Sequence, residues 1–405
     1  MNPKPTKVAV PLKPFQEALK LLGRSIPSKP SLPILSSVLI QIKGKELILS
    51  STDLYFAVRI KISLSESFEA EAAIPAASLR DMISSFDSEV IYLQFLPENL
   101  LIEADGSQVK FAVNNPVDFP EFPEVEDELS SLSLESVSQI SQKVCFAAGV
   151  DQARPVLTGL LLNFSSHQIE AVATDGFRLS VLKVVDTQIE GEKSLLIPAR
   201  FFSEVSRIAL TQQVKKIRVF INQEQRQLRF ILDNTEIFVR LLEGEYPPYK
   251  KIIPDRQGVD TTYIILVDPL LKELKRAQVL AREESNIVEI KGDFSEEDSQ
   301  EKLHKKDQEQ KSSENNNIKT MSSEQIIINT QTTSKGIYQG SIQLLRGSQG
   351  SQKVALNIGY LQEYLQNIEA EQVKLEITDS LKPLMVTNPD DQSLLYVVMP
   401  FRVNS

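Results

Sequence analysis

Three segments of the chain share one pattern of apolar and polar positions. The pattern predicts a short amphipathic helix in each: IPAASLRDMI from Ile74, IPARFFSEVS from Ile197 and LNIGYLQEYL from Leu356. Pro75 and Pro198 stand near the start of the first two, where proline is tolerated because the first N–H groups of a helix lack an intrahelical partner. An alternating strand pattern follows each helix: EVIYLQFL, KKIRVFIN and EQVKLEIT. The chain therefore predicts one structural unit repeated three times.

The remaining parts of the repeat agree with this prediction. A strand leading into a helix precedes each segment, in KVAVPLKPFQEALKLL, SLSLESVSQISQKVCF and YIILVDPLLKELKRAQ. Further strands lie between the two helices, such as VLIQIKGKELILSS and LLLNFSSHQIEAVAT. We therefore predict an α+β fold with three similar domains of the β-α-β type.

The third repeat is longer than the others. Its first strand and second helix lie 92 residues apart (Ile264 to Leu356), against 66 in the first repeat (Val8 to Ile74) and 65 in the second (Leu132 to Ile197). The extra length coincides with a polar, highly charged segment near 293–323 that has almost no apolar residues. Such a composition cannot bury enough surface to order itself, so we predict a long flexible insertion, with a solvated loop of no special role as the plain alternative.

Proline-rich connectors mark the domain boundaries. DFPEFPEVEDE ends the first repeat and EGEYPPYKKIIP ends the second. The predicted domains are 1–127, 128–254 and 255–405, the last containing the insertion.

Charge is unevenly distributed along the chain. The formal net charge is −10, which by itself disfavours binding to phosphates. The predicted helices nevertheless hold 11 basic and 9 acidic residues; we take them as 11–26, 75–86, 135–149, 198–210, 267–283 and 357–369. If the helices shared one surface, they would attract a DNA backbone without reading its bases. The alternative is that Lys and Arg are simply good helix formers.

The composition offers little for catalysis. Cys145 is the only cysteine, which excludes a disulfide framework, and the two histidines are His167 and His304. We find no phosphate-binding Gly-Lys-Ser/Thr loop, no HExxH and no paired cysteines, so we predict neither an enzyme nor a cofactor nor a metal. A polar N-terminus and the lack of an apolar run of membrane-spanning length predict a cytoplasmic protein with no membrane partner.

Several motifs closely resemble those of bacterial DNA sliding clamps, the β subunits of DNA polymerase III. The most specific is ATDGFRLS at Ala173–Ser180, preceded by ARPVLTGLLL at Ala153–Leu162. SLPILSSVLI and STDLYFAV resemble the counterparts of these motifs in the first domain of the family. EYPPYKKIIP resembles the join between the second and third domains, and YVVMPFRV at Tyr396–Val403 resembles the closing strand. The resemblance covers nearly the whole chain, and the charged insertion is the main departure.

The resemblance implies a head-to-tail homodimer that forms a ring, with helices lining the hole and sheets outside. Double-stranded DNA would thread the ring. A clamp loader would open and close it, and the replicative polymerase and other proteins carrying a clamp-binding motif would attach to it. The clamp itself would catalyse nothing.

The resemblance also implies a pocket for partner peptides. Its residues are mostly apolar, which suits a short hydrophobic peptide, and Met399 suits several related peptides because its side chain repacks easily. Phe177 stands where some clamps have His, so it cannot change charge near neutral pH. Core packing is the alternative reading of each position. The pocket would consist of Leu157, Thr174, Gly176, Phe177, Arg178, Leu179, Pro247, Ile252, Val397, Met399, Pro400, Phe401 and Arg402.

Two further sets of residues complete the prediction. For ring closure, the resemblance points to Phe111 and Val113 on an edge strand, packed against Val279 and Leu280 at the end of a helix. The candidates for DNA contact come from a loop before SLPIL, a loop near the hole and the helices, with an ordinary solvated helix face as the alternative: Lys20, Arg24, Lys29, Arg80, Lys143, Arg154, Arg200, Arg207, Lys272 and Arg276.

A second function remains open on the sequence alone. A relative of the clamps that had lost DNA or polymerase binding could serve as a scaffold. Retention of both ATDGFRLS and YVVMPFRV disfavours loss of the pocket, whereas the small basic excess of the helices leaves room for altered DNA affinity.

Overall fold

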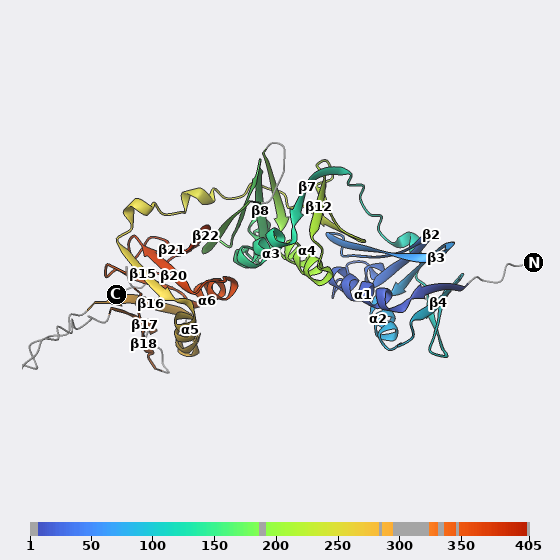
Figure 1. Cartoon of the computed structure of the whole chain (residues 1–405), viewed down its shortest axis with the longest axis horizontal. Coiled ribbons are helices and arrows are strands. Elements are labelled where there is room, and N and C mark those ends of the chain that lie inside the picture. Colours follow the sequence, from blue (N-terminus) through green and yellow to red (C-terminus); the bar gives the residue numbers. More distant parts are fainter. Residues whose placement is uncertain are drawn as a thin grey trace, which may run out of the picture. The chain divides into compact units, whose positions relative to one another are not determined.

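The computed structural model describes residues 7–185, 192–282, 286–294, 324–330, 336–345 and 348–402 (Figure 1). Contacts divide the chain into two compact units, which we describe separately. Unit 1 comprises Met1–Ser141, Asp151–Ala171 and Val184–Glu245, and unit 2 comprises Gln142–Val150, Val172–Lys183 and Tyr246–Ser405.

The first repeat lies wholly in unit 1. Its elements are β1 (Lys7–Pro11), α1 (Leu12–Leu22), β2 (Ser37–Thr52), β3 (Phe56–Pro75), α2 (Ala76–Ser84), β4 (Val90–Leu96), β5 (Asn99–Ala104) and β6 (Ser107–Ala112). A four-stranded sheet runs in the order β1-β4-β5-β6, so β6 is an edge strand. The long strands β2 and β3 pair with each other along most of their length.

The second repeat contributes to both units. Its elements are β7 (Asp127–Ser133), α3 (Leu134–Lys143), β8 (Gly159–Ser165), β9 (Gln168–Thr174), β10 (Arg178–Val184), β11 (Lys193–Pro198), α4 (Ala199–Gln212), β12 (Lys216–Asn222), β13 (Gln227–Leu232) and β14 (Thr235–Arg240). In unit 1, β14 pairs with β3 and completes a six-stranded sheet of order β2-β3-β14-β13-β12-β7. One continuous sheet therefore joins the first repeat to the second.

The third repeat lies wholly in unit 2. Its elements are β15 (Thr261–Leu266), α5 (Val267–Ala281), β16 (Ile287–Asp293), β17 (Gln325–Thr330), β18 (Gln339–Gln343), β19 (Lys353–Asn357), α6 (Ile358–Asn367), β20 (Gln372–Ile377), β21 (Leu384–Asn388) and β22 (Asp391–Val398). Within this unit β10 pairs with β22, which continues through β21 and β20 to β15, and a second sheet has the order β18-β17-β16-β19.

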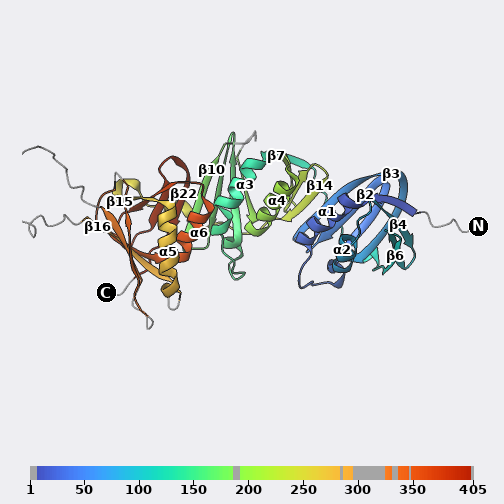
Figure 2. The same ribbon diagram turned by 60° about the horizontal axis from the view of Figure 1, so that its bottom comes forward.

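The helices have the amphipathic pattern that the sequence predicts. In α1, Leu12, Phe15, Leu19 and Leu22 are buried at the spacing of one helix face, and polar residues occupy the other. Figure 2 shows α1 and α2 side by side, and the Gln16 side chain donates to the carbonyl oxygens of two residues at the end of α2 and just beyond it (2.9 and 3.2 Å).

Two predicted helices, 11–26 and 135–149, end earlier in the structure, whereas α4 runs to Gln212, two residues beyond its predicted end. α1 ends at Leu22, where Gly23–Ser25 forms a 3₁₀ turn, and α3 ends at Lys143 before a second such turn at Cys145–Ala147. Apolar spacing alone did not reveal these turns because each still has buried residues: Ser25 in the first turn, and Cys145 and Ala147 in the second. The six observed helices contain nine basic and seven acidic residues, so their excess of two positive charges is unchanged.

The predicted insertion near 293–323 falls almost entirely outside the described residues. Only its first two positions are described, at the end of β16 and just after it. No helix in the described part of the chain is long and apolar enough to cross a membrane.

Candidate functional site

The site predicted from the sequence lies at the pairing of β10 with β22, which we call the second junction. The two strands run antiparallel, with Arg178 opposite Val398 and Leu182 opposite Leu394. Leu179 and Val397 stand opposite each other in this register, and both are 2 % exposed. The register therefore brings the motifs ATDGFRLS and YVVMPFRV together.

The loop Thr174–Phe177 enters this junction through a tight network of hydrogen bonds. The Gly176 N–H donates to the Thr174 hydroxyl (3.1 Å), and the Phe177 and Arg178 N–H groups donate to the Asp175 carboxylate (2.8 and 3.0 Å). Gly176 has φ +93°, a conformation in which a side chain is strained, which explains glycine at this position. The Met399 N–H then donates to the Phe177 carbonyl (2.8 Å), so the loop is fixed to the end of β22.

Arg178 is buried within this junction. Its Nε donates to Asp175 (3.0 Å), one Nη to Glu363 on α6 (2.5 Å) and the other Nη to the Phe146 carbonyl (2.8 Å). The guanidinium also lies over the rings of Tyr360 (4.8 Å to the centroid) and Phe146 (5.6 Å). The side chain therefore holds the loop against α6, and three of its nitrogens already have partners inside the protein.

The electrostatics of the junction keep this arginine charged. Burial acts to lower the pKa of Arg178, but Tyr396, Glu363 and Asp175 raise that pKa above its ordinary value. Burial also raises the pKa of the Tyr396 hydroxyl, which donates to the Tyr360 carbonyl (2.9 Å). The guanidinium of Arg178 is therefore charged at neutral pH.

Three large apolar side chains beside the paired ends of β10 and β22 are exposed. Phe177, Met399 and Phe401 are 59 %, 38 % and 51 % exposed, which is unusual for large apolar side chains. Pro247, Ile252 and Pro400 are half-buried, and Gly176 and Arg402 are exposed. We call Phe177, Met399 and Phe401 the apolar patch.

The remaining predicted pocket residues have other positions. Thr174, Leu179 and Val397 are buried and support the patch from within unit 2. Leu157 belongs to unit 1, in a 3₁₀ turn at Pro155–Thr158, and is half-buried there.

Four residues of the second junction were not singled out from the sequence: Phe146, Tyr360, Glu363 and Tyr396. Phe146 lies in a short turn and Tyr360 and Glu363 on α6, far from the recognised motifs in sequence. Tyr364 and Tyr396 stack with ring centroids 4.6 Å apart. The repeat itself offered a signal for Glu363. This residue and Glu204 occupy the same position of the repeated helix, the sixth residue of α6 and of α4.

The residues predicted to contact DNA are exposed in the structure, except for Lys143, which is half-buried. In unit 1, Lys20 and Arg80 border the same cavity, of about 380 Å³, between α1 and α2. Arg24 bonds to Glu204 (2.7 Å), which also bonds to Arg207. Among the described residues Lys20, Lys29, Arg154 and Lys272 have no ion-pair partner, whereas these four do: Arg80 with Asp81, Arg200 with Asp53, Arg207 with Glu204 and Arg276 with Glu273.

The residues predicted for ring closure lie on open elements. Phe111 is on the edge strand β6, and the Val113 N–H just beyond donates to the Glu98 carbonyl (3.1 Å). Val279, in the last turn of α5, is 59 % exposed, and Leu280 is half-buried. No group of three or more His, Cys, Asp or Glu in the described ranges is arranged to hold a metal ion.

Three family profiles match the chain along most of its length. They are described as the N-terminal, central and C-terminal domains of the DNA polymerase III beta subunit, and they match residues 6–123, 131–248 and 311–402. The chain belongs to the DNA polymerase III beta subunit family, the bacterial sliding clamps.

Individual relatives agree over nearly the full length. The beta sliding clamp of Pseudomonas aeruginosa is 25 % identical over 397 residues, covering 97 % of both chains. That of Staphylococcus epidermidis is 25 % identical, covering 94 % of both. Among solved structures, the beta subunit of Streptococcus pyogenes has a TM-score of 0.86 at 20 % identity, covering 98 % of this chain and 100 % of the other. A sliding clamp of Pseudomonas aeruginosa bound to griselimycin has a TM-score of 0.84 at 22 % identity, covering 99 % and 100 %.

Proposed function

We propose that this protein is a DNA sliding clamp that encircles duplex DNA and tethers the replicative polymerase through the apolar patch. Membership of the beta subunit family carries the proposal. The protein acts as a ring and not as an enzyme, and it works in the cytoplasm on chromosomal DNA. The proposed domains are 1–127, 128–254 and 255–405, with the domain joins at the two proline-rich connectors.

Ring closure is supported by a pattern that occurs twice within the chain. The last strand of the second repeat, β14, pairs with β3 of the first, and the last strand of the third repeat, β22, pairs with β10 of the second. The corresponding third pair is open: β6 is the last strand of the first repeat and an edge, and β18 is an edge of the third. Pairing β6 with β18 of a second copy uses both edges, and the reciprocal pair closes a head-to-tail dimer.

The dimer is tested by its mass in solution. Light scattering at micromolar concentration should give twice the mass of the 405-residue chain. Val279→Asp should give the monomer because it places a charge on a predicted contact. Val150→Asp, at an exposed valine (92 %) outside the predicted contact, should leave the dimer intact. A monomer for the unchanged protein would reject the ring.

Topological binding to DNA is the decisive test of function. After loading by the cognate clamp loader with ATP, the protein should remain on nicked circular DNA and slide off the same DNA once it is cut. Lys20→Glu with Arg80→Glu should weaken retention in a salt-dependent way, since both exposed residues border one cavity of unit 1. Equal retention on circular and linear DNA would contradict the encircling ring and leave a scaffold that binds DNA weakly or not at all.

The apolar patch is tested by peptide binding. A peptide copied from the clamp-binding motif of the cognate polymerase should lose about tenfold or more in affinity with Phe177→Ala plus Met399→Ala, because both exposed side chains offer apolar contact. Leu381→Ala, a change at another exposed apolar residue (61 %), provides the matched control. Unchanged affinity in the double variant would remove the patch from the proposal.

A further inference from the structure

The pairing of β14 with β3 in unit 1, which we call the first junction, repeats the backbone of the second junction. The Leu54 N–H donates to the Thr52 hydroxyl (2.9 Å), as that of Gly176 does to Thr174. The Tyr55 and Phe56 N–H groups donate to the Asp53 carboxylate (2.9 and 2.7 Å). The Arg240 N–H donates to the Tyr55 carbonyl (2.9 Å), as that of Met399 does to Phe177.

The correspondence extends to the strain of the loop. Leu54 has φ +78° where Gly176 has φ +93°. A branched side chain at positive φ carries strain that glycine avoids, so the surrounding bonds hold this loop in place. The side chains of Leu54 and Tyr55 are 43 % and 56 % exposed, and Tyr55 occupies the position of Phe177.

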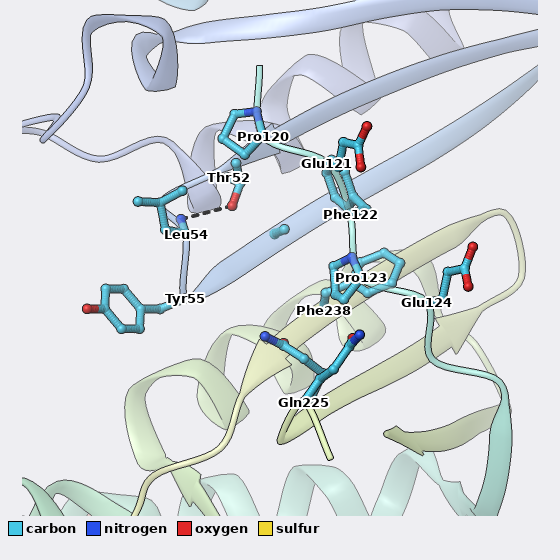
Figure 3. Close-up of a pocket in the computed structure, with 12 residues that line it drawn as sticks. Thr52, Leu54, Tyr55, Pro120, Glu121, Phe122, Pro123, Glu124, Gln225 and Phe238 are labelled. Carbon is cyan, nitrogen blue, oxygen red and sulfur yellow. Dashed lines mark hydrogen bonds between the residues drawn. The ribbon is translucent and has the colours of Figure 1, made fainter. Parts of the chain in front are cut away.

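At the first junction the loop borders a cavity of about 430 Å³ (Figure 3). This volume lies within the range of ligand sites in proteins, which often form where domains meet. The connector between the first two repeats crosses β3 here. The side chains of Glu121 and Glu124 lie on one side of the connector, and Leu54 and Tyr55 lie on its other side. Phe122 anchors the connector against Phe238, with ring centroids 5.2 Å apart.

The lining combines apolar and acidic groups. Tyr55, Leu54 and Phe122 supply apolar surface, and the exposed Glu121 and Glu124 supply two carboxylates that pair with no cation among the described residues. Arg59 lies against Phe122 (4.3 Å from its ring centroid) and bonds to the buried Glu236 (3.3 Å), a carboxylate that it shares with Arg229 (3.0 Å) and Lys61 (3.6 Å). None of the described residues that line the cavity is cationic, and its two carboxylates favour a cationic ligand and disfavour nucleic acid.

We infer that the first junction is a second peptide-docking site, which takes a short extended segment of a partner protein with basic residues flanking a large apolar one. Tyr55 and Phe122 contact the apolar side chain, and Glu121 and Glu124 pair with the basic ones. The inference goes beyond the proposed function. It rests in part on the peptide-binding role of the apolar patch, because the loops of the two junctions share one pattern of backbone hydrogen bonds. Each site of the chain then selects its own class of peptide.

Tryptophan fluorescence tests this directly, because the chain contains no Trp and a Trp in the probe is the only one in the sample. The probe is the capped peptide Ala-Arg-Leu-Trp-Arg-Ala, titrated with the full-length protein. Binding should be at least about tenfold tighter than that of Ala-Glu-Leu-Trp-Glu-Ala, and the difference should shrink with added salt. Equal binding of the two peptides, or no binding of the basic one, would overturn the inference.

Variants locate the binding to one junction. Tyr55→Ala and, separately, Glu121→Gln with Glu124→Gln should each weaken the basic peptide by about tenfold. All three positions are exposed, and unchanged thermal unfolding confirms that the variants are folded. Phe177→Ala with Met399→Ala should leave this binding unchanged. If only Phe177→Ala with Met399→Ala abolished binding of the basic peptide, that peptide would bind at the second junction and the inference would be wrong. Failure of the polymerase peptide to bind would count only against the proposed function.

Discussion

The two junctions of this chain make similar contacts from corresponding positions of the repeat. An arginine and a phenylalanine, however, have exchanged places between them. In the second junction the residue four after the loop threonine is Arg178, and the middle of the 3₁₀ turn is Phe146. In the first junction the corresponding residues are Phe56 and Arg24. Each arginine bonds to the glutamate at the sixth position of the next repeated helix: Arg178 to Glu363 at 2.5 Å and Arg24 to Glu204 at 2.7 Å.

The exchange also keeps a stacked contact between the loop and the repeated helix. Phe56 stacks on Phe201 (5.0 Å, 11°), and Arg178 lies over Tyr360, the equivalent residue of α6 (4.8 Å). The contact between loop and helix is therefore preserved as a stacked pair, while the charged group moves from an exposed turn to a buried loop. The Arg178 side chain is 9 % exposed and that of Arg24 is 34 % exposed, so the same ion pair should matter more at the second junction.

The largest expected effect comes from removing the buried arginine. Arg178→Ala leaves the Asp175 and Glu363 carboxylates without their partner and should lower the free energy of unfolding by about 2–3 kcal/mol, below the full penalty for a buried pair because Glu363 is half exposed. Chemical denaturation followed by circular dichroism measures this. A loss below about 1 kcal/mol would mean that Arg178 does not hold the junction together.

Exchanging the two side chains should recover part of that loss. Arg178→Phe combined with Phe146→Arg recreates the arrangement of the first junction, so the double variant should be about 1–2 kcal/mol more stable than the sum of the single changes predicts. A double-mutant cycle gives this coupling energy. Additive effects would show that the two junctions are not interchangeable.

The corresponding change at the first junction should be milder. Arg24→Ala should cost about 1 kcal/mol or less, because the pair is more exposed and Glu204 keeps its bond to Arg207. The same denaturation experiment serves, repeated at high salt, where the difference from the unchanged protein should shrink. A cost equal to that of Arg178→Ala would remove burial as the cause of the contrast.

The smallest effects concern the loop glycine. Gly176→Ala should cost about 1 kcal/mol through backbone strain alone, since a Cβ there meets no atom within 4 Å. Leu54→Gly should relieve the matching strain and change stability by less than about 1 kcal/mol in either direction, since some apolar contact is lost. The melting temperatures of the two variants compare the backbone strain at Gly176 and at Leu54. Leu54→Ala separates side-chain loss from strain, because alanine keeps the strained conformation.

Much of the site followed from the sequence because its motifs are local. Thr174, Asp175 and Gly176 bond within one loop, so a short pattern reports their geometry. Pairing of the loop with YVVMPFRV was reached through resemblance. The role of Arg178 was not predictable, because Phe146 and Glu363 lie 32 and 185 residues away from it in the chain and carry no motif of their own. The cavity at the first junction was not predicted either, since four separate segments line it, at 52–57, 120–124, 225–227 and 238.

The sequence by itself determined the threefold repeat, the amphipathic helices and the alternating strands, because periodicity reflects which face of each element is buried. It also determined the loops that begin Thr-Asp, whose hydrogen bonds are made within a few residues. Only the tertiary structure decided which arginine is buried, which aromatic rings stack and which carboxylates line a cavity. Those outcomes depend on strand register and on helices brought together from distant parts of the chain, and a repeat can exchange its side chains while keeping the same backbone.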